Sequence, residues 1–126
     1  MAEGFLKAIA GEQYDVHSAG TDPAQFVHPL AVQVMRESGI DISQQRPKHV
    51  KEYLGRLPIK YLIIVCEGAN EKCPRVFPGM HERLFWGFED PAAFVGSSDE
   101  TLEKFRAIRD QIEGRLAQWV KETINV

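Results

Sequence analysis

The feature that most constrains the fold of this chain is an unbroken apolar run, YLIIVC, at residues 61–66. A run of strand length without polar alternation is typical of a strand buried on both faces, as in parallel sheets covered by helices. It is far shorter than the roughly 20 residues that a membrane-spanning helix needs. The run therefore predicts a buried strand of a soluble protein.

Helix and strand patterns alternate along the rest of the chain. Before the run, apolar spacing predicts helices at residues 2–10 and 28–38 and a strand at residues 14–18. A short helix is expected at residues 49–56, and another strand at residues 81–88. Strands that alternate with helices predict an α/β fold, a three-layer sandwich with a mainly parallel sheet.

The last part of the chain predicts a long helix. Ser97 and Glu100 have the spacing of a capping box, in which a serine hydroxyl and a glutamate side chain bond to each other's backbone N–H. Apolar residues then recur at helical spacing. They are Leu102, Phe105, Ile108, Ile112, Leu116 and Val120.

Length and composition limit the classes of function. The chain has 126 residues, which suits one domain over residues 1–126, and its net charge of −3 predicts no nucleic-acid or membrane partner. Two cysteines do not make a disulfide framework, so we expect a reducing, cytoplasmic location. Active sites of parallel sheets lie at the carboxyl ends of the strands, which directs attention to the segments after Ser18, Cys66 and Phe88.

Two cysteines follow the buried strand with C-x6-C spacing. Cys66 ends the strand, and Cys73 stands in a polar segment, CEGANEKC. By themselves the two residues allow a reversible disulfide or two inert thiols, since free cysteine is among the most buried residue types. A zinc site with His81 is disfavoured, because it has only three ligands and lacks the usual short cysteine spacing. We therefore expect no metal.

Asp90 follows the next predicted strand, in FWGFEDPAAF. An aspartate at the carboxyl edge of a sheet can act as a general acid toward an oxyanion leaving group, although a turn residue before proline has the same pattern. Glu89 is either a carboxylate that supports Asp90 or a solvated side chain. The histidines show no spacing that marks a catalytic triad, and we interpret each as structural or exposed.

Several stretches together resemble one family. MAEGFL, HSAGTDPA with HPLAVQVMRESGIDIS, VCEGANEKCP, and FWGFEDPAAF with FRAIRDQIE are similar, in this order, to thioredoxin-coupled arsenate reductases of the low-molecular-weight tyrosine phosphatase superfamily. The cysteine pair is specific to the reductase branch. The resemblance implies the phosphatase-like fold, an arsenate or phosphate oxyanion as substrate, thioredoxin as partner, and no cofactor beyond that external thiol reductant.

The resemblance also implies roles for three residues. In the family, a cysteine in an N-terminal C-x5-R loop attacks arsenate, and the aspartate matching Asp90 protonates the leaving oxygen. The cysteine matching Cys66 then attacks the nucleophile's sulfur and arsenite is released. The cysteine matching Cys73 takes over the disulfide, which thioredoxin reduces. Such exchange needs an accessible thiolate at each step.

The sequence departs from the family at one point, because it contains no C-x5-R. We expect it to be truncated before the helix at residues 2–10, without the first strand and phosphate loop, and inactive as written. The lost strand predicts unpaired sheet edges and a strand-sharing homodimer. Three interpretations remain: a reductase whose product starts upstream, a non-catalytic redox or binding protein, or a truncated tyrosine phosphatase.

Overall fold

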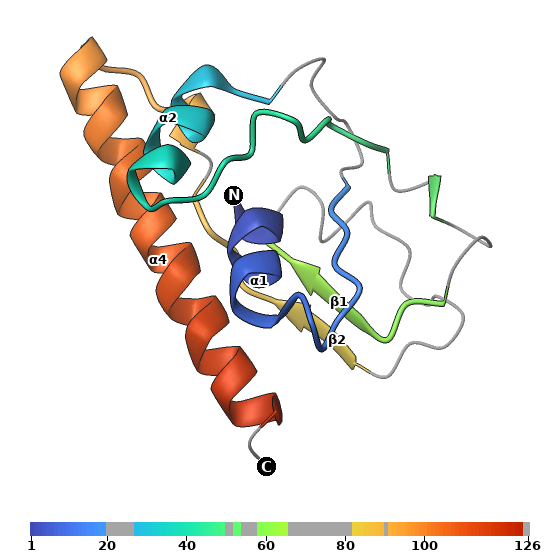
Figure 1. The fold of residues 1–126 in the computed structure, drawn as a ribbon. Helices are drawn as coiled ribbons and strands as arrows, with labels where there is room; N and C mark the ends of the chain where they lie inside the picture. Colours follow the sequence, from blue (N-terminus) through green and yellow to red (C-terminus); the bar gives the residue numbers. More distant parts are fainter. Residues whose placement is uncertain (20–26, 50–51, 54–57, 66–81, 90, 125–126) are drawn as a thin grey trace.

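The computed structural model of the protein describes residues 1–19, 27–49, 52–53, 58–65, 82–89 and 91–124. They contain the helices α1 (Ala2–Ala10), α2 (Pro29–Glu37) and α4 (Ser98–Ile124), the strands β1 (Tyr61–Ile64) and β2 (Glu82–Phe85), and the 3-10 helix η2 (Pro91–Ala93). Figure 1 shows α4 as the longest element, with α1 and α2 beside it and the strand pair beyond α1.

The capping box predicted before α4 is present. The backbone N–H of Glu100 donates to Ser97 Oγ at 3.1 Å, and the Ser97 N–H donates to Glu100 Oε1 at 3.3 Å. These bonds satisfy N–H groups that a helix end otherwise leaves without partners. Although α4 has 27 residues, neither it nor another helix of the described chain is apolar enough over a sufficient length to cross a membrane.

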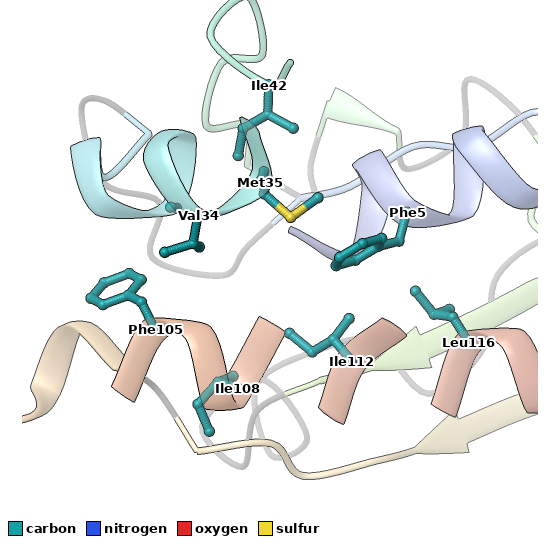
Figure 2. Close-up of a cluster of buried hydrophobic side chains, with 9 residues drawn as sticks. Phe5, Val34, Met35, Ile42, Phe105, Ile108, Ile112 and Leu116 are labelled. Carbon is teal, nitrogen blue, oxygen red and sulfur yellow. The ribbon is translucent and has the colours of Figure 1, made fainter. Parts of the chain in front are cut away.

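The hydrophobic core lies between α4 and the two shorter helices. Figure 2 shows one row of side chains from α4 facing a second row from α1, α2 and the turn after α2. The predicted stripe of α4 is confirmed at its centre, although Leu102 and Val120 at its two ends are only half-buried. The core side chains are Phe5, Ala31, Val34, Met35, Ile42, Phe105, Ile108, Ile112 and Leu116.

The predicted end of α2 at Gly39 is confirmed and has a clear physical cause. Gly39 has φ of +79°, in the left-handed region that favours glycine. Its N–H donates to the Arg36 carbonyl at 2.9 Å, and the Ile40 N–H donates to the Met35 carbonyl at 3.0 Å. This pair of bonds is a Schellman motif, which closes the helix and turns Ile40 back toward it.

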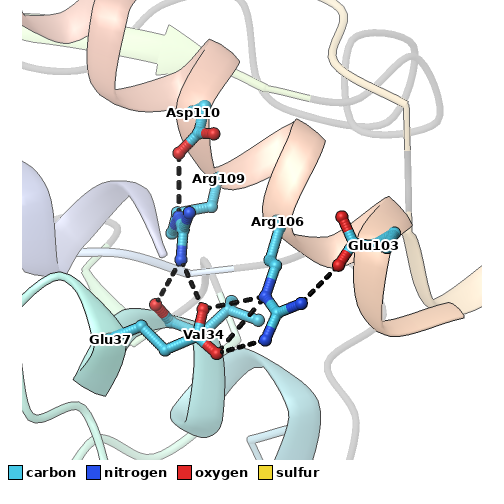
Figure 3. Close-up of polar contacts among 6 residues, drawn as sticks. All are labelled: Val34, Glu37, Glu103, Arg106, Arg109 and Asp110. Atoms are coloured by element: carbon cyan, nitrogen blue, oxygen red, sulfur yellow. Dashed lines mark hydrogen bonds and ion pairs between the residues drawn. The ribbon is translucent and has the colours of Figure 1, made fainter. Parts of the chain in front are cut away.

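A charged network joins α2 to α4 on the outer side of this core. Glu37 at the end of α2 accepts hydrogen bonds from Arg106 and Arg109 of α4, with shortest distances of 2.7 and 2.8 Å (Figure 3). Arg109 also donates to the Val34 carbonyl at 3.0 Å. The hydrogen bonds from Arg106, followed by the one from Arg109, lower the pKa of Glu37 to about 2.

The strands form a parallel pair, as the alternation of elements predicted. Tyr61 lies opposite Glu82 and Ile64 lies opposite Phe85. β1 is less buried than its apolar sequence predicted, because only Ile64 is fully buried and the three residues before it are half-buried. Trp119, which the sequence pattern missed, packs its ring 5.2 Å from that of Tyr61.

The strand predicted at residues 14–18 is wrong, because this segment is irregular. A strand needs a neighbouring strand for its backbone groups, and within the described residues β1 pairs with β2 alone. Side-chain packing holds the segment instead. The Tyr14 ring lies 5.8 Å from Tyr61 and 5.6 Å from Trp119, and Val16 is buried.

Most of the short helix expected at residues 49–56 lies outside the described residues. Among its described residues, the Glu52 N–H donates to the His49 carbonyl at 2.9 Å. The Glu52 carboxylate also accepts from the His49 N–H at 3.1 Å and from Arg46 at 2.8 Å.

Candidate functional site

The candidate site is the edge of the sheet at the carboxyl ends of β1 and β2. Backbone pairing continues past the strands, since the Trp86 N–H donates to the Ile64 carbonyl at 2.8 Å and the Phe88 N–H to the Val65 carbonyl at 2.9 Å. The chains that leave the two strands are therefore held together through Val65 and Phe88. In a parallel sheet this is the edge at which active sites are built.

The three residues that sequence reasoning assigned to catalysis, Cys66, Cys73 and Asp90, lie outside the described residues. Their described neighbours in the sequence are Val65, which is half-buried, Glu89, which is exposed, and Pro91, which is buried. The structure therefore describes this edge at Val65, Glu89 and Pro91, which flank Cys66 and Asp90.

Contacts with α4 hold the segment between β2 and α4. Lys104 of α4 forms an ion pair with Glu89, and its Nζ lies 5.7 Å from the centre of the Phe94 ring. The Phe94 N–H donates to the Pro91 carbonyl at 3.3 Å, which forms the turn of η2. The Glu89 side chain is 64% exposed, which agrees with the solvated role that the sequence left open, while a contact between Glu89 and Asp90 lies outside the described residues. No local pattern links Glu89 to Lys104, because their contact requires the folded chain.

The beginning of α1 carries a buried charged pair. Glu3 and Lys48 have side chains that are only 3% and 12% exposed, and Lys48 Nζ lies 3.2 Å from Glu3 Oε1. The other carboxylate oxygen, Oε2, is buried and has no hydrogen-bond partner among the described residues. Lys48 thus compensates a carboxylate in the first turn of a helix, where backbone N–H groups attract anions. Sequence reasoning did not find this pair, because its members are far apart in the chain.

The histidines among the described residues make structural contacts, as the sequence predicted. His28 precedes α2 and its Nδ1 accepts from the Leu30 N–H at 3.1 Å, which caps the helix. His17 lies 3.0 Å from Asp15, and its ring is 5.0 Å from the Tyr53 ring. Across the described segments, histidine, cysteine and acidic side chains form no group that could hold a metal ion.

Comparison with known proteins identifies the family. The family model for low molecular weight phosphotyrosine protein phosphatases matches residues 1–125. An arsenate reductase of Oceanobacillus iheyensis is 38% identical over 122 residues, which cover 96% of this chain and 85% of the relative. An arsenate reductase of Halalkalibacterium halodurans is 40% identical over 117 residues, which cover 92% of this chain and 81% of the relative.

Solved structures agree with this result. The chain superposes on an arsenate reductase in the oxidized state with a TM-score of 0.78, and on one in the phosphate-binding state with a TM-score of 0.77. Each is 29% identical in sequence, and each match covers 96% of this chain and 86% of the other. The predicted low-molecular-weight phosphatase-like α/β fold is therefore confirmed. The chain belongs to the low molecular weight phosphotyrosine protein phosphatase family, and among its relatives in that family are arsenate reductases.

Proposed function

We propose that this protein is of the arsenate reductase type and that its Cys66 and Cys73 form a disulfide that thioredoxin reduces. Turnover of arsenate also requires a C-x5-R nucleophile, which the 126 residues do not contain. The observation that carries the proposal is the similarity to arsenate reductases over more than nine tenths of the chain. Matching structures in reduced, oxidized and intermediate states support a reaction in which the protein itself changes its redox state.

The electron balance of the proposed reaction is simple. Two thiols give up two electrons and two protons and join as a disulfide. Arsenate takes up the two electrons and becomes arsenite, and one of its oxygen atoms leaves as water. Thioredoxin then returns the protein disulfide to two thiols by thiol–disulfide exchange. Asp90 is proposed to protonate the oxygen that leaves, which is the work of a general acid.

The described geometry is compatible with these roles. The hydrogen bond from Phe88 to Val65 joins the two chain segments that lead toward Asp90 and Cys66. A carboxyl group and a thiol that serve one reaction must come from segments held near each other. A relay that depends on free thiols also requires a reducing compartment, so the proposal includes a cytoplasmic location.

The first experiment tests the cysteine pair. The purified chain is oxidised with diamide, and peptide mass spectrometry locates the disulfide. We expect a bond between Cys66 and Cys73, which thioredoxin, thioredoxin reductase and NADPH return to thiols with consumption of one NADPH per chain. Cys66→Ser and Cys73→Ser are the controls, and each should abolish this consumption. If the oxidised wild-type chain consumes no NADPH, the reductase proposal is wrong.

A tyrosine phosphatase is the second candidate, because the matching family model carries that description. Para-nitrophenyl phosphate and arsenate, tested side by side, separate the two activities. Both require a nucleophile, and the 126 residues contain no C-x5-R. We therefore expect this chain to show steady turnover of neither substrate. With a C-x5-R segment joined ahead of Met1, we expect arsenate reduction that requires Cys66 and Cys73. Turnover of the phosphate ester alone would favour the phosphatase.

We also propose a homodimer that shares strands. Within the described residues β1 pairs with β2, and the edge of a sheet is in general a template for pairing with a strand of a second chain. Light scattering measures the mass in solution, which for a monomer is 14.3 kDa. A monomer across the micromolar range would contradict the dimer.

A further inference from the structure

The helix α2 is capped at its beginning by a histidine. His28 has an extended backbone, and its Nδ1 accepts a hydrogen bond from the Leu30 N–H at 3.1 Å. Its carbonyl accepts from the Val32 N–H at 3.2 Å. Pro29, at the first helical position, has no N–H that needs a partner. His28 therefore supplies the side-chain acceptor that serine, threonine, asparagine or aspartate usually supplies at this position.

The capping bond fixes the protonation state of the ring. An imidazole accepts through Nδ1 only when that nitrogen carries no proton, so the proton of the capping ring is on Nε2. Histidine is the side chain that usually takes up a second ring proton between about pH 8 and 5. With that proton, Nδ1 of His28 becomes a donor that faces the donor N–H of Leu30. Its positive charge also lies at the end of the helix where the backbone dipole is positive.

Packing on α4 holds the ring of His28 in this place. The centre of the ring lies 4.7 Å from the centre of the Phe105 ring, and Phe105 is 2% exposed. Figure 2 shows Phe105 directed from α4 toward α2. His28 as a whole is exposed, so water can deliver a proton to it without unfolding of the chain. The ring is thus held on one side and accessible on the other.

The described acids near this end of α2 do not offset an added positive charge. The first turn of α2 contains no acidic residue. The helix that packs on α2 is α4. Its charged side chains within about one turn of Phe105 already form ion pairs. These pairs are Lys104–Glu89, Arg106–Glu103, Arg106–Glu37, Arg109–Glu37 and Arg109–Asp110.

We propose that His28 makes the beginning of α2 sensitive to pH: the neutral ring caps the helix, and the protonated ring releases its first turn. The opening is local, because the other end of α2 is closed by the Schellman motif at Gly39 and by Glu37, whose pKa of about 2 keeps it charged at pH 5. The half-buried side chains of Val27 and Leu30, which pack against the core, are released with the turn. None of these contacts involves the cysteines of the proposed function.

The first test follows the wild-type chain by NMR from pH 8 to pH 5. A long-range 1H–15N spectrum of the imidazole rings shows which ring nitrogen carries the proton, and we expect Nε2 for His28 at pH 8. Hydrogen exchange of the Leu30 amide, corrected for the intrinsic effect of pH, should become about fivefold faster as the ring takes up its second proton, as for the loss of a helix cap. A proton on Nδ1 at pH 8, or exchange of Leu30 that does not follow the ring, would overturn the proposal.

The second test uses two variants that do not titrate at this position. His28→Ser keeps a capping oxygen and His28→Ala has none, while both lose the contact with Phe105. As the pH falls from 8 to 5, the thermal midpoint of the wild type should drop relative to both variants, and the gap between the two variants should stay constant. His17→Gln is the control and should show the same drop as the wild type, since it retains His28. A wild-type midpoint that stays at a fixed distance from both variants would contradict a role for the charge of His28.

Discussion

Two phenylalanines illustrate how differently the two regions of this molecule are held. Phe105 lies in the helical layer and is 2% exposed, whereas Phe85, at the end of β2, is 46% exposed. The helical layer buries its apolar side chains against one another, and the strand pair buries only Ile64 completely. Because burial of apolar surface is the main favourable contribution to folding, we infer that packing between the helices contributes most of the free energy of unfolding.

Among the described residues, the carboxyl edge of the strands is held by backbone hydrogen bonds, an ion pair and two half-buried aromatic side chains, Trp86 and Phe88, that pack against the core. Backbone bonds join Phe88 to Val65 and Trp86 to Ile64, and Lys104 holds Glu89. Regions that take part in ligand exchange are drawn from the less stable parts of a fold. A disulfide that passes to thioredoxin must be reached by a second protein, which a tightly buried position would prevent. The contrast between the two regions is therefore suited to the proposed chemistry.

The largest predicted effect tests this contrast directly. Phe105→Ala removes a buried ring from the core and should lower the free energy of unfolding by about 3–5 kcal/mol. Phe85→Ala is the matched substitution in the strand pair, and we expect a loss of roughly 1 kcal/mol or less, since nearly half of that ring already faces water. Urea unfolding followed by circular dichroism measures both. Equal losses would show that stability is shared evenly between the regions.

A pair of glycines gives the next largest effect. A Cβ on Gly4 of α1 would lie 2.8 Å from Ile42 and 3.1 Å from Met35, so Gly4→Ala should cost about 1–3 kcal/mol through overpacking. A Cβ on Gly114 of α4 would meet nothing within 4 Å, and Gly114→Ala should stabilise the protein by roughly 0.5–1 kcal/mol. Opposite changes in the thermal midpoint are expected. Stabilisation by Gly4→Ala would mean that α1 packs less closely than described.

The junction between the two regions is the capping box of α4. Ser97→Ala removes the hydroxyl oxygen that accepts from the Glu100 N–H and should cost about 1 kcal/mol. Ser97→Asp retains an acceptor at the same position and should restore most of the loss. Urea unfolding of the two variants provides the comparison. If Ser97→Asp is as unstable as Ser97→Ala, the bond to the Glu100 N–H is not the cause.

Residue patterns that are local in the sequence were sufficient to predict where the helices begin and end. The bounds of α1, the end of α2 at Gly39 and the capping box at Ser97 follow from residues that interact within one or two turns. The strand predicted at residues 14–18 is wrong for the opposite reason, because a strand depends on a partner that the local pattern does not contain. Trp119 was missed since its burial depends on Tyr14 and Tyr61, which are remote in sequence.

The candidate site was predicted through the family resemblance more than through spacing. C-x6-C and Asp-Pro are weak patterns by themselves, and their residues Cys66, Cys73 and Asp90 lie outside the described chain. The ion pair between Glu89 and Lys104, which flanks the candidate site in the sequence, has no signature in the sequence because it joins a loop to a helix face. Such contacts emerge only when the fold is known.

The smallest predicted effect concerns Glu37, whose network reinforces the helical layer. The hydrogen bonds from Arg106 and Arg109 lower its pKa from 4.5 to about 2, so the carboxylate favours the folded state at pH values above 4.5. This contribution should be lost as the pH falls from 4.5 toward 2. Glu37→Gln should therefore unfold at a lower temperature than the wild type at pH 7. The effect should be modest, because the network faces water.

The same network predicts how that difference changes with pH. The gap between the thermal midpoints of Glu37→Gln and the wild type should narrow steadily below pH 4.5 and nearly close at pH 2, as the wild-type carboxylate takes up its proton. Glu122→Gln, on the exposed last turns of α4, is the control, and its gap should stay small throughout. A gap for Glu37→Gln that is constant from pH 7 to pH 2 would mean that shape rather than charge joins α2 to α4. The contacts of Glu37 with Arg106 and Arg109 would then contribute to stability without depending on its charge.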